Sequence, residues 1–153
     1  LIMVIMSKER GKHGIAMSPL EYAENKARMV AFFKRMMNLS PRGDGFPRWQ
    51  DSANQLIENA YQLWQWQVFT DSRTGRPMTF HDIASQLCRN LHVRMPSNIY
   101  AVARYSRSTR RLPVVDYFAM LWREARLGPE ILVSWEDPIT LPKPATYRGL
   151  FTC

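Results

Sequence analysis

No Asp or Glu occurs between residues 83 and 115, a stretch of 33 residues. The stretch contains six arginines, so it supplies six of the eight net positive charges of the chain. These arginines are Arg89, Arg94, Arg104, Arg107, Arg110 and Arg111. Basic charge gathered in one segment, rather than spread over a surface, is the electrostatic footprint of a protein that binds a polyanion. Nucleic acid is therefore the first partner that the sequence indicates.

Cysteine and histidine are scarce. Cys88 and Cys153 stand far apart without a pairing pattern, which argues against a disulfide scaffold and favours the cytoplasm. Cys88 falls in an apolar helical segment, where a buried structural thiol is expected. His13, His81 and His92 lack metal-ligand spacing, and no glycine pattern for nucleotide binding occurs. We therefore predict a protein that is not an enzyme, with no metal, no cofactor and no small-molecule substrate.

Long apolar runs are also missing. The first six residues are apolar, but a membrane-spanning helix needs about 20 apolar residues. They also lack the preceding basic residues of a signal peptide. We predict no membrane partner, a disordered leader over residues 1–17 and an extended tail over residues 134–153, which contains Pro138, Pro142 and Pro144. Between them, residues 18–133 are predicted to form one helical domain, because a 46% hydrophobic content can fill a core.

Several amphipathic helices are predicted within this domain. Ser18 and Pro19 start the first, which ends near residue 38, and a loop rich in Pro and Gly covers residues 39–47. The next helix covers about residues 49–68 and exposes Glu58, and another opens at Pro113. Residues 131–135 fit either a short strand or a last helical turn. The apolar stripe of the first helix is Leu20, Ala23, Ala27, Val30, Ala31 and Met37, widened by Phe32 and Phe33.

Residues 79–108 are predicted to form two short helices joined by a turn. Thr79, with Asp82 three residues later, makes a capping-box-like start. Pro96 excludes helix at the residue before it, and Ser97 or Asn98 can cap the second helix. The connection is longer than the tight turn of the simplest helix-turn-helix motifs. We predict a compact, mainly α domain with a helix-turn-helix or winged-helix-like unit, whose first helix buries Phe80, Ile83, Ala84, Leu87 and Leu91.

The second helix of this pair carries the candidate binding residues. It would present Asn98, Tyr100, Arg104 and Arg107 to duplex DNA. Arg110 and Arg111 would contact the phosphate backbone from the following loop, and Arg94 completes the predicted set. The alternative is a helical protein-interaction module whose basic face docks an acidic partner, because many helix pairs with a solvated basic face bind no DNA.

Residues of about 49–122 also carry a pattern that resembles a known family. The pattern consists of Trp49, Ser52, Ala53, Leu56, Ile57, Glu58, Ala60, Tyr61 and Leu63, then Phe80, Ile83 and Ala84, then Asn98, Ile99 and Tyr100, then Arg104, Arg107 and Arg110. It resembles the C-terminal domain of RteC, the regulator of excision on Bacteroides tetracycline-resistance conjugative transposons.

The resemblance implies a cytoplasmic DNA-binding regulator with a winged-helix-like domain, which binds near a promoter and activates excision genes. The chain departs from the family in two places. It is too short to hold the family's further N-terminal domain in full, and residues 111–116 form a longer path into the last helix than the family pattern leads us to expect. We predict a DNA-binding transcription regulator or accessory protein of a mobile genetic element. Its expected partner is double-stranded DNA, and a homodimer stays open.

Overall fold

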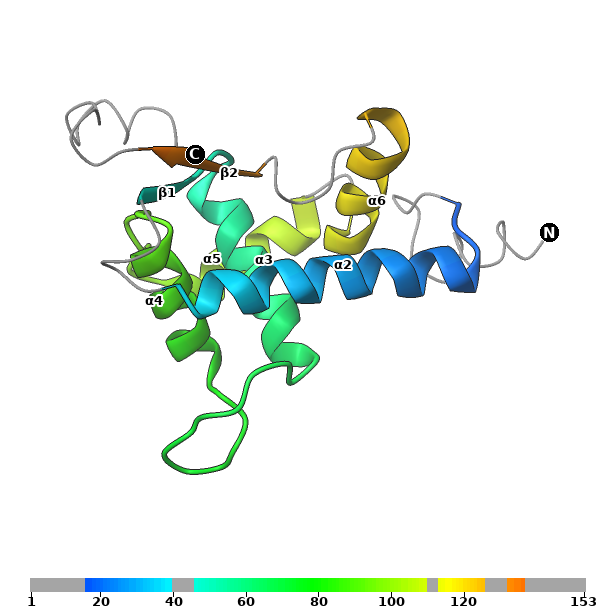
Figure 1. Ribbon diagram of the computed structural model, residues 1–153. Helices are drawn as coiled ribbons and strands as arrows, with labels where there is room; N and C mark the ends of the chain where they lie inside the picture. Colours follow the sequence, from blue (N-terminus) through cyan, green and yellow to red (C-terminus); the bar gives the residue numbers. More distant parts are fainter. Residues whose placement is uncertain (1–15, 40–45, 110–112, 126–131, 137–153) are drawn as a thin grey trace.

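The computed structural model describes residues 16–39, 46–109, 113–125 and 132–136 of the chain. These residues form five helices and a two-stranded sheet, which confirms the prediction of a mainly α fold (Figure 1). None of the described helices combines the length and the apolar character needed to cross a membrane. The elements are α2 (Pro19–Met37), β1 (Phe46–Trp49), α3 (Ala53–Gln65), α4 (Phe80–Asn90), α5 (Ile99–Thr109), α6 (Val114–Ala125) and β2 (Val133–Glu136).

Helix starts follow the predicted capping residues. Ser18 Oγ accepts a hydrogen bond from the backbone N–H of Glu21 at 3.0 Å, and Thr79 Oγ1 accepts one from the N–H of Asp82 at 3.1 Å. Each bond satisfies a donor that has no partner within its helix. The start of α6 also agrees with the prediction, because the carbonyl of Pro113 accepts the first helical bond. The predicted starts of α2, α4 and α6 are confirmed.

α3 begins later than predicted. Ser52 is its N-cap, because its Oγ accepts a hydrogen bond from the N–H of Gln55 at 3.0 Å. Trp49, predicted to open this helix, instead ends β1 and is fully buried. Its indole Nε1 donates to the Ser52 carbonyl at 2.9 Å, which ties the strand to the helix start. The predicted helix of residues 49–68 is therefore too long at both ends.

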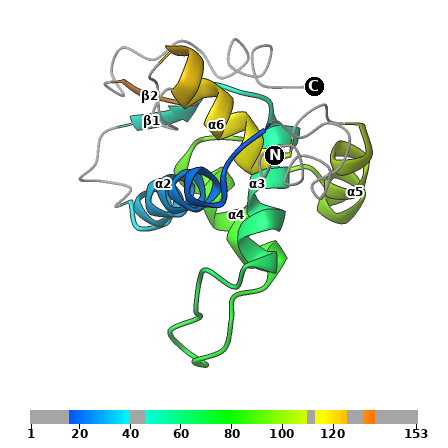
Figure 2. The same ribbon diagram turned by 90° about the vertical axis from the view of Figure 1, so that its right-hand side faces the viewer.

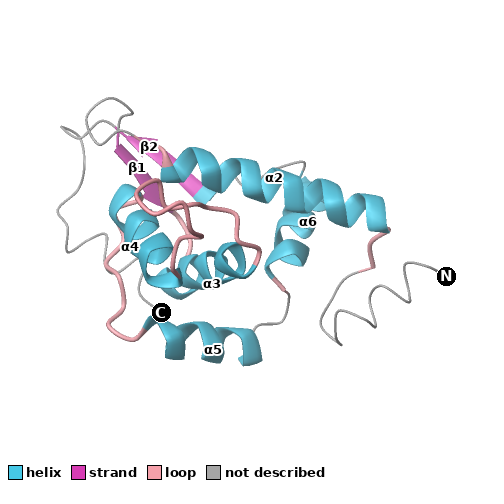
Figure 3. Ribbon diagram, turned by 90° about the horizontal axis from the view of Figure 1, so that it is seen from below, coloured by secondary structure: helices cyan, strands magenta, loops and turns pink. Residues whose placement is uncertain are grey.

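The central helix of the fold is α3. Both α4 and α5 pack against it, and α6 contacts α2 and α3. Figures 2 and 3 show α2 and α5 on opposite sides of α3. Because α3 is covered from several sides, it buries polar side chains too, and the prediction that Glu58 is exposed is wrong. Asn59 Nδ2 donates to the Gln55 carbonyl at 2.7 Å and to the Gln55 side-chain oxygen at 3.0 Å, so this buried face also carries hydrogen bonds.

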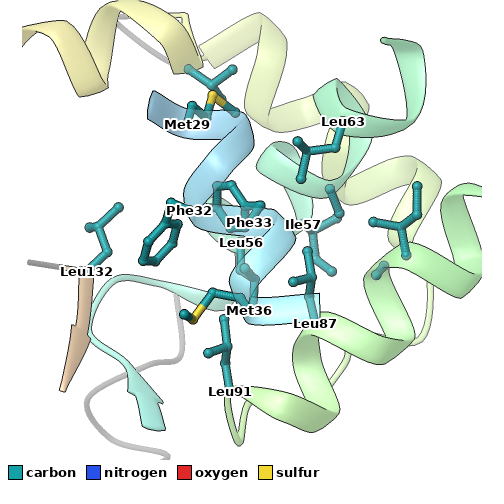
Figure 4. Close-up of a cluster of buried hydrophobic side chains, with 14 of the residues drawn as sticks. Met29, Phe32, Phe33, Met36, Leu56, Ile57, Leu63, Leu87, Leu91 and Leu132 are labelled. Carbon is teal, nitrogen blue, oxygen red and sulfur yellow. The ribbon is translucent and has the colours of Figure 1, made fainter. Parts of the chain in front are cut away.

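α2 buries only part of the predicted apolar stripe, because Phe32, Phe33 and Met37 are buried as expected but the rest of the stripe is not. Leu20 is 69% exposed, and Ala23, Ala27 and Ala31 are not buried either. The buried face contains larger side chains, which come from Met29, Phe32, Phe33, Met36 and Met37 (Figure 4). Burial stabilises by roughly 25 cal/mol per Å² of apolar surface. The helix is therefore more stable with its Met and Phe side chains inside and its alanines toward water.

The sheet joins two segments that are far apart in the sequence. β1 and β2 are antiparallel, with Phe46 opposite Glu136 and Trp49 opposite Val133. The predicted loop over residues 39–47 is wrong for Phe46 and Pro47, which belong to β1. β2 also extends three residues beyond the predicted domain end at residue 133. The sequence allows either a short strand or a helical turn over residues 131–135, and the structure has the strand β2 there from Val133.

The N-terminal end of α2 is joined to α6 by a paired Glu and Arg, from which we predict a pH-dependent contribution to stability. Arg123 Nε donates a hydrogen bond to Glu21 Oε2 at 2.7 Å. Arg123 Nη2 donates to the other carboxylate oxygen, Oε1, and to the carbonyl of Ala16. The hydrogen bond from Arg123 is the main reason that the pKa of Glu21 lies below its ordinary value of 4.5. A lowered folded-state pKa stabilises the fold above pH 4.5, and this contribution is lost as the pH falls through that pKa.

Glu21→Gln is therefore expected to lower the urea midpoint at pH 7 and to leave it unchanged well below pH 4.5. The reduction in unfolding free energy at pH 7 should be at most about 1 kcal/mol, because both side chains are about one-third exposed. Urea titrations at both pH values test this, and Glu24→Gln on the same helix serves as the control. A reduction of equal size at both pH values would show that the ionised pair is not its cause.

Candidate nucleic-acid interface

α5 lies at the periphery of the molecule, on the side of α3 away from α2 (Figure 2). One face packs inward through Ile99, Ala103 and Ser106, which are buried. The opposite face holds Tyr100, Arg104 and Tyr105, which are exposed along with the small Ala101. Residues four apart lie on the same side of a helix, so Ile99 and Ala103 share the inward face and Tyr100 and Arg104 share an outward one. An accessible helix face with an arginine between two tyrosines results.

Asn98 caps α5. Its Oδ1 accepts a hydrogen bond from the N–H of Ala101 at 3.2 Å, and its carbonyl accepts the first helical bond from Val102. The structure thus uses Asn98 rather than Ser97 as the cap. A bidentate contact with adenine needs both the oxygen and the nitrogen of an Asn side chain. While the cap is in place, only the amide nitrogen of Asn98 can donate outward, which suits a phosphate oxygen better than a base edge.

Tyr100 is held in an aromatic cluster at the junction of three helices. Its ring meets Phe80 of α4 edge to face, with centroids 5.0 Å apart, and Phe80 in turn contacts Tyr61 and Trp64 of α3. Tyr100 remains 53% exposed, whereas Tyr105 is 66% exposed. Tyr105 is absent from the predicted set of binding residues, although its place outside the apolar stripe of the helix is the signal that could have included it.

Of the predicted arginines, the structure describes the side chains of two. Arg94 lies in the connection between α4 and α5 and Arg104 lies on α5; both are exposed. Neither makes an ion pair with another described residue. Arg107 belongs to α5, but its side chain is outside the description, and so are Arg110 and Arg111. Among the described residues, one cation without an ion pair, Arg94, therefore precedes α5, and another, Arg104, lies at the middle of the helix.

The connection between α4 and α5 is a structured segment of eight residues. Leu91 and Val93 are buried and anchor it to the core. His92 between them has a positive φ of 59° and stacks on Phe46 of β1, with centroids 3.6 Å apart. Its Nδ1 also lies 2.7 Å from the Pro47 carbonyl. These contacts tie the connection to β1, so the placement of α5 depends on the sheet as well as on α3.

A cleft of about 520 Å³ lies between the end of α2, the segment after α3 and the outer face of α4. Its charged lining residues are Asp71, Arg73, Asp82 and Arg89. The two carboxylates offset the two arginines, so the cleft lacks the single sign of charge that concentrates a polyanion. Within the described ranges, no three His, Cys, Asp or Glu side chains gather where they could hold a metal ion. We therefore place the candidate interface on α5 and not in this cleft.

Cys88 lies on the inner face of α4. It is 3% exposed, and burial raises the pKa of its thiol to about 12. A thiol with this pKa is protonated at neutral pH and is a poor nucleophile. The prediction of a buried structural thiol is confirmed.

Comparisons of the chain with protein families, with characterised proteins and with solved structures gave no match. Function is therefore inferred from the residues and the geometry described above. Three features indicate the function: the exposed face of α5, the exposed side chains of Arg94 and Arg104, and the acid-free stretch. We use this name for residues 83–115, which contain no Asp or Glu and include both arginines.

Proposed function

We propose that the protein binds duplex DNA through the outer face of α5, as a transcription regulator or accessory factor of a mobile genetic element. The observation that carries the proposal is the exposed Arg104, between Tyr100 and Tyr105, on a peripheral helix without acidic residues. The mobile-element role rests on the resemblance to RteC. In this proposal α4 and α5 act as a helix-turn-helix or winged-helix-like unit supported by α3.

The dimensions of α5 suit the major groove. Its 11 residues extend for about 16 Å, and the groove, about 12 Å wide, admits an α-helix. Arg104 would contact a base edge, where a guanidinium can donate two hydrogen bonds to guanine. Arg94 and the free nitrogen of Asn98 would contact phosphates at the start of the helix and fix its register on the duplex.

A second candidate function is the docking of an acidic protein partner on the same face. The exposed Tyr100 and Tyr105 favour it, because Tyr and Arg are among the residues that most often dominate binding at protein interfaces. Both functions predict binding that weakens with salt, so salt dependence alone does not separate them. They differ in sequence preference, which only DNA binding predicts.

A competition experiment separates the two functions. Wild-type protein is titrated against a duplex selected from a random pool, against the duplex of its own upstream region and against a scrambled duplex. We expect tighter binding to the selected duplex and a linear fall of log affinity with log salt, with a slope of about −0.9 per phosphate contact. Polyglutamate serves as the competitor for an acidic-partner site. No shifted band at moderate salt, together with tight binding of polyglutamate, would contradict the proposal.

A further inference from the structure

The segment between α3 and α4 is a hairpin that projects from the body of the molecule (Figures 1 and 2). We call residues 69–78 the hairpin. Its two arms are joined by backbone hydrogen bonds from Asp71 N–H to the Arg76 carbonyl at 2.8 Å and from Met78 N–H to the Phe69 carbonyl at 3.0 Å. The sequence predicts a polar turn over residues 71–77 whose Arg73 and Arg76 extend the basic surface. In the structure, the hydrogen bonds between the two arms hold this projection in one conformation.

The tip of the hairpin is fixed by its own polar groups. Gly75 has a φ of 72°, which favours glycine, and its N–H donates to the Asp71 carbonyl at 2.8 Å. The Asp71 carboxylate accepts a hydrogen bond from the N–H of Arg73 at 2.8 Å, and the N–H of Arg76 donates to Thr74 Oγ1 at 3.2 Å. These bonds position both arginines without any contribution from the core.

The composition of the hairpin suits phosphate contacts. Between Thr70 and Pro77 every residue except Asp71 is exposed, and hydroxyl groups accompany Arg73 and Arg76. Arg, Ser and Thr side chains and backbone N–H groups are among the groups that donate hydrogen bonds to DNA phosphates.

Ordering such a segment costs about 1–2 kcal/mol per residue in backbone entropy. Phe69 and Met78 at its ends pack against the core, but the exposed residues between them bury little apolar surface that could offset this cost. Arg76 has no ion pair with a described residue. The exposed Arg73 lies 3.6 Å from the partly buried carboxylate of Asp71, and an ion pair of this kind at the surface contributes little free energy.

The base of the hairpin lies beside the first turn of α5. Phe80 follows the hairpin closely and contacts Tyr100 of α5. The hairpin points away from this junction, and α5 lies on the side of α3 opposite α2 (Figure 2). An arm of four residues extends about 13 Å, which corresponds to about four base pairs. A duplex that lies on α5 and continues along the projecting hairpin would bring its flanking phosphates within reach of the hairpin.

We propose that the hairpin is a second DNA contact, in which Arg73 and Arg76 bind phosphates that flank the site on α5. This inference rests on the proposed function and adds a sequence-independent contact outside the base-contacting helix. It would fix the orientation of the protein on the duplex, because the hairpin lies on only one side of the start of α5.

The test uses two duplexes, one limited to the site and one extended by about eight base pairs on each side, which exceeds the reach of the hairpin. We expect wild type to bind the extended duplex several-fold more tightly than the short one. The double variant Arg73→Ala/Arg76→Ala should abolish that gain, bind the short duplex as wild type does, and reduce the salt slope on the extended duplex by up to about two units. Arg73→Lys/Arg76→Lys should retain most of the gain, because lysine still offers a charge to phosphate.

Lys34→Ala, which removes one exposed charge from α2, is the control and should leave both affinities unchanged. Unchanged urea midpoints would show that the exposed substitutions leave the fold intact. If the double alanine variant keeps the gain, or binds both duplexes more weakly by the same factor, the flanking contact is wrong while DNA binding by α5 stands. If wild type binds neither duplex, both proposals are wrong.

Discussion

Replacing Leu87 with Ala is expected to lower the free energy of unfolding by about 2–5 kcal/mol. Leu87 is fully buried, and it lies in a cluster with residues of α2 and α3 (Figure 4). The substitution removes apolar packing and leaves a cavity that the surrounding core fills only in part. This reduction is a large share of the roughly 5–15 kcal/mol that stabilises a typical domain.

Urea denaturation followed by far-ultraviolet circular dichroism measures the reduction. Arg89→Ala is a matched control, because it introduces the same residue two positions further along α4, where the side chain is exposed. The control should stay within about 0.5 kcal/mol of wild type. An unchanged midpoint for Leu87→Ala would contradict the packing of α4 against α2 and α3.

The register of α4 could be predicted because its sequence allows only one buried face. Phe80, Ile83 and Leu87 recur at helical spacing, and polar or charged residues occupy the opposite side. α2 lacks this clarity, since alanines form one stripe and Met and Phe form another. Alanine tolerates both water and the core, so local pattern cannot decide between the two faces. The size of the space offered by the neighbouring helices decides, and only the tertiary structure contains that information.

The sheet could not be predicted for a related reason. Each strand has four residues, and the two strands that pair lie far apart in the sequence. Strands of this length carry too little periodicity to be recognised, and Pro47 in β1 argues against a strand in any local reading. Pro47 is accommodated because, in the described part of the chain, β1 pairs with β2 on one side only, as an edge strand, where a missing N–H is tolerated. Nonlocal pairing, rather than intrinsic preference, produces these strands.

The sequence predicts which residues belong to the candidate site better than it predicts how their side chains are held. The exposure of Tyr100 and Arg104 follows from helical periodicity, and the acid-free stretch is visible in the sequence itself. The capping bond of Asn98 restricts that side chain to donating outward, which residue type alone does not convey. The order of the hairpin depends on backbone bonds between its arms, and a polar turn sequence does not indicate their extent.

The arginines of the acid-free stretch are expected to fall into two classes on DNA. Arg104 lies on the exposed face of α5, where it can meet a base edge, and Arg107 is expected to behave alike from its place on the same helix. Replacing Arg104 with Ala should cost about 1–3 kcal/mol for the preferred duplex, since alanine cannot make the bidentate hydrogen bonds to guanine. The cost for a scrambled duplex should be smaller, because that duplex offers no matching base.

Arg110 and Arg111 follow α5 in the sequence and are predicted to bind phosphates, which every duplex presents alike. The double variant Arg110→Ala/Arg111→Ala should therefore weaken binding to both duplexes equally and reduce the salt slope by about one unit for each phosphate that is no longer bound. Titration of wild type, both variants and the Lys34→Ala control at several salt concentrations distinguishes the two classes. If Arg104→Ala lowers affinity for both duplexes alike, Arg104 binds phosphate and not a base. If all proteins bind both duplexes equally at every salt concentration, α5 does not recognise DNA, and the acidic partner becomes the better explanation of its basic face.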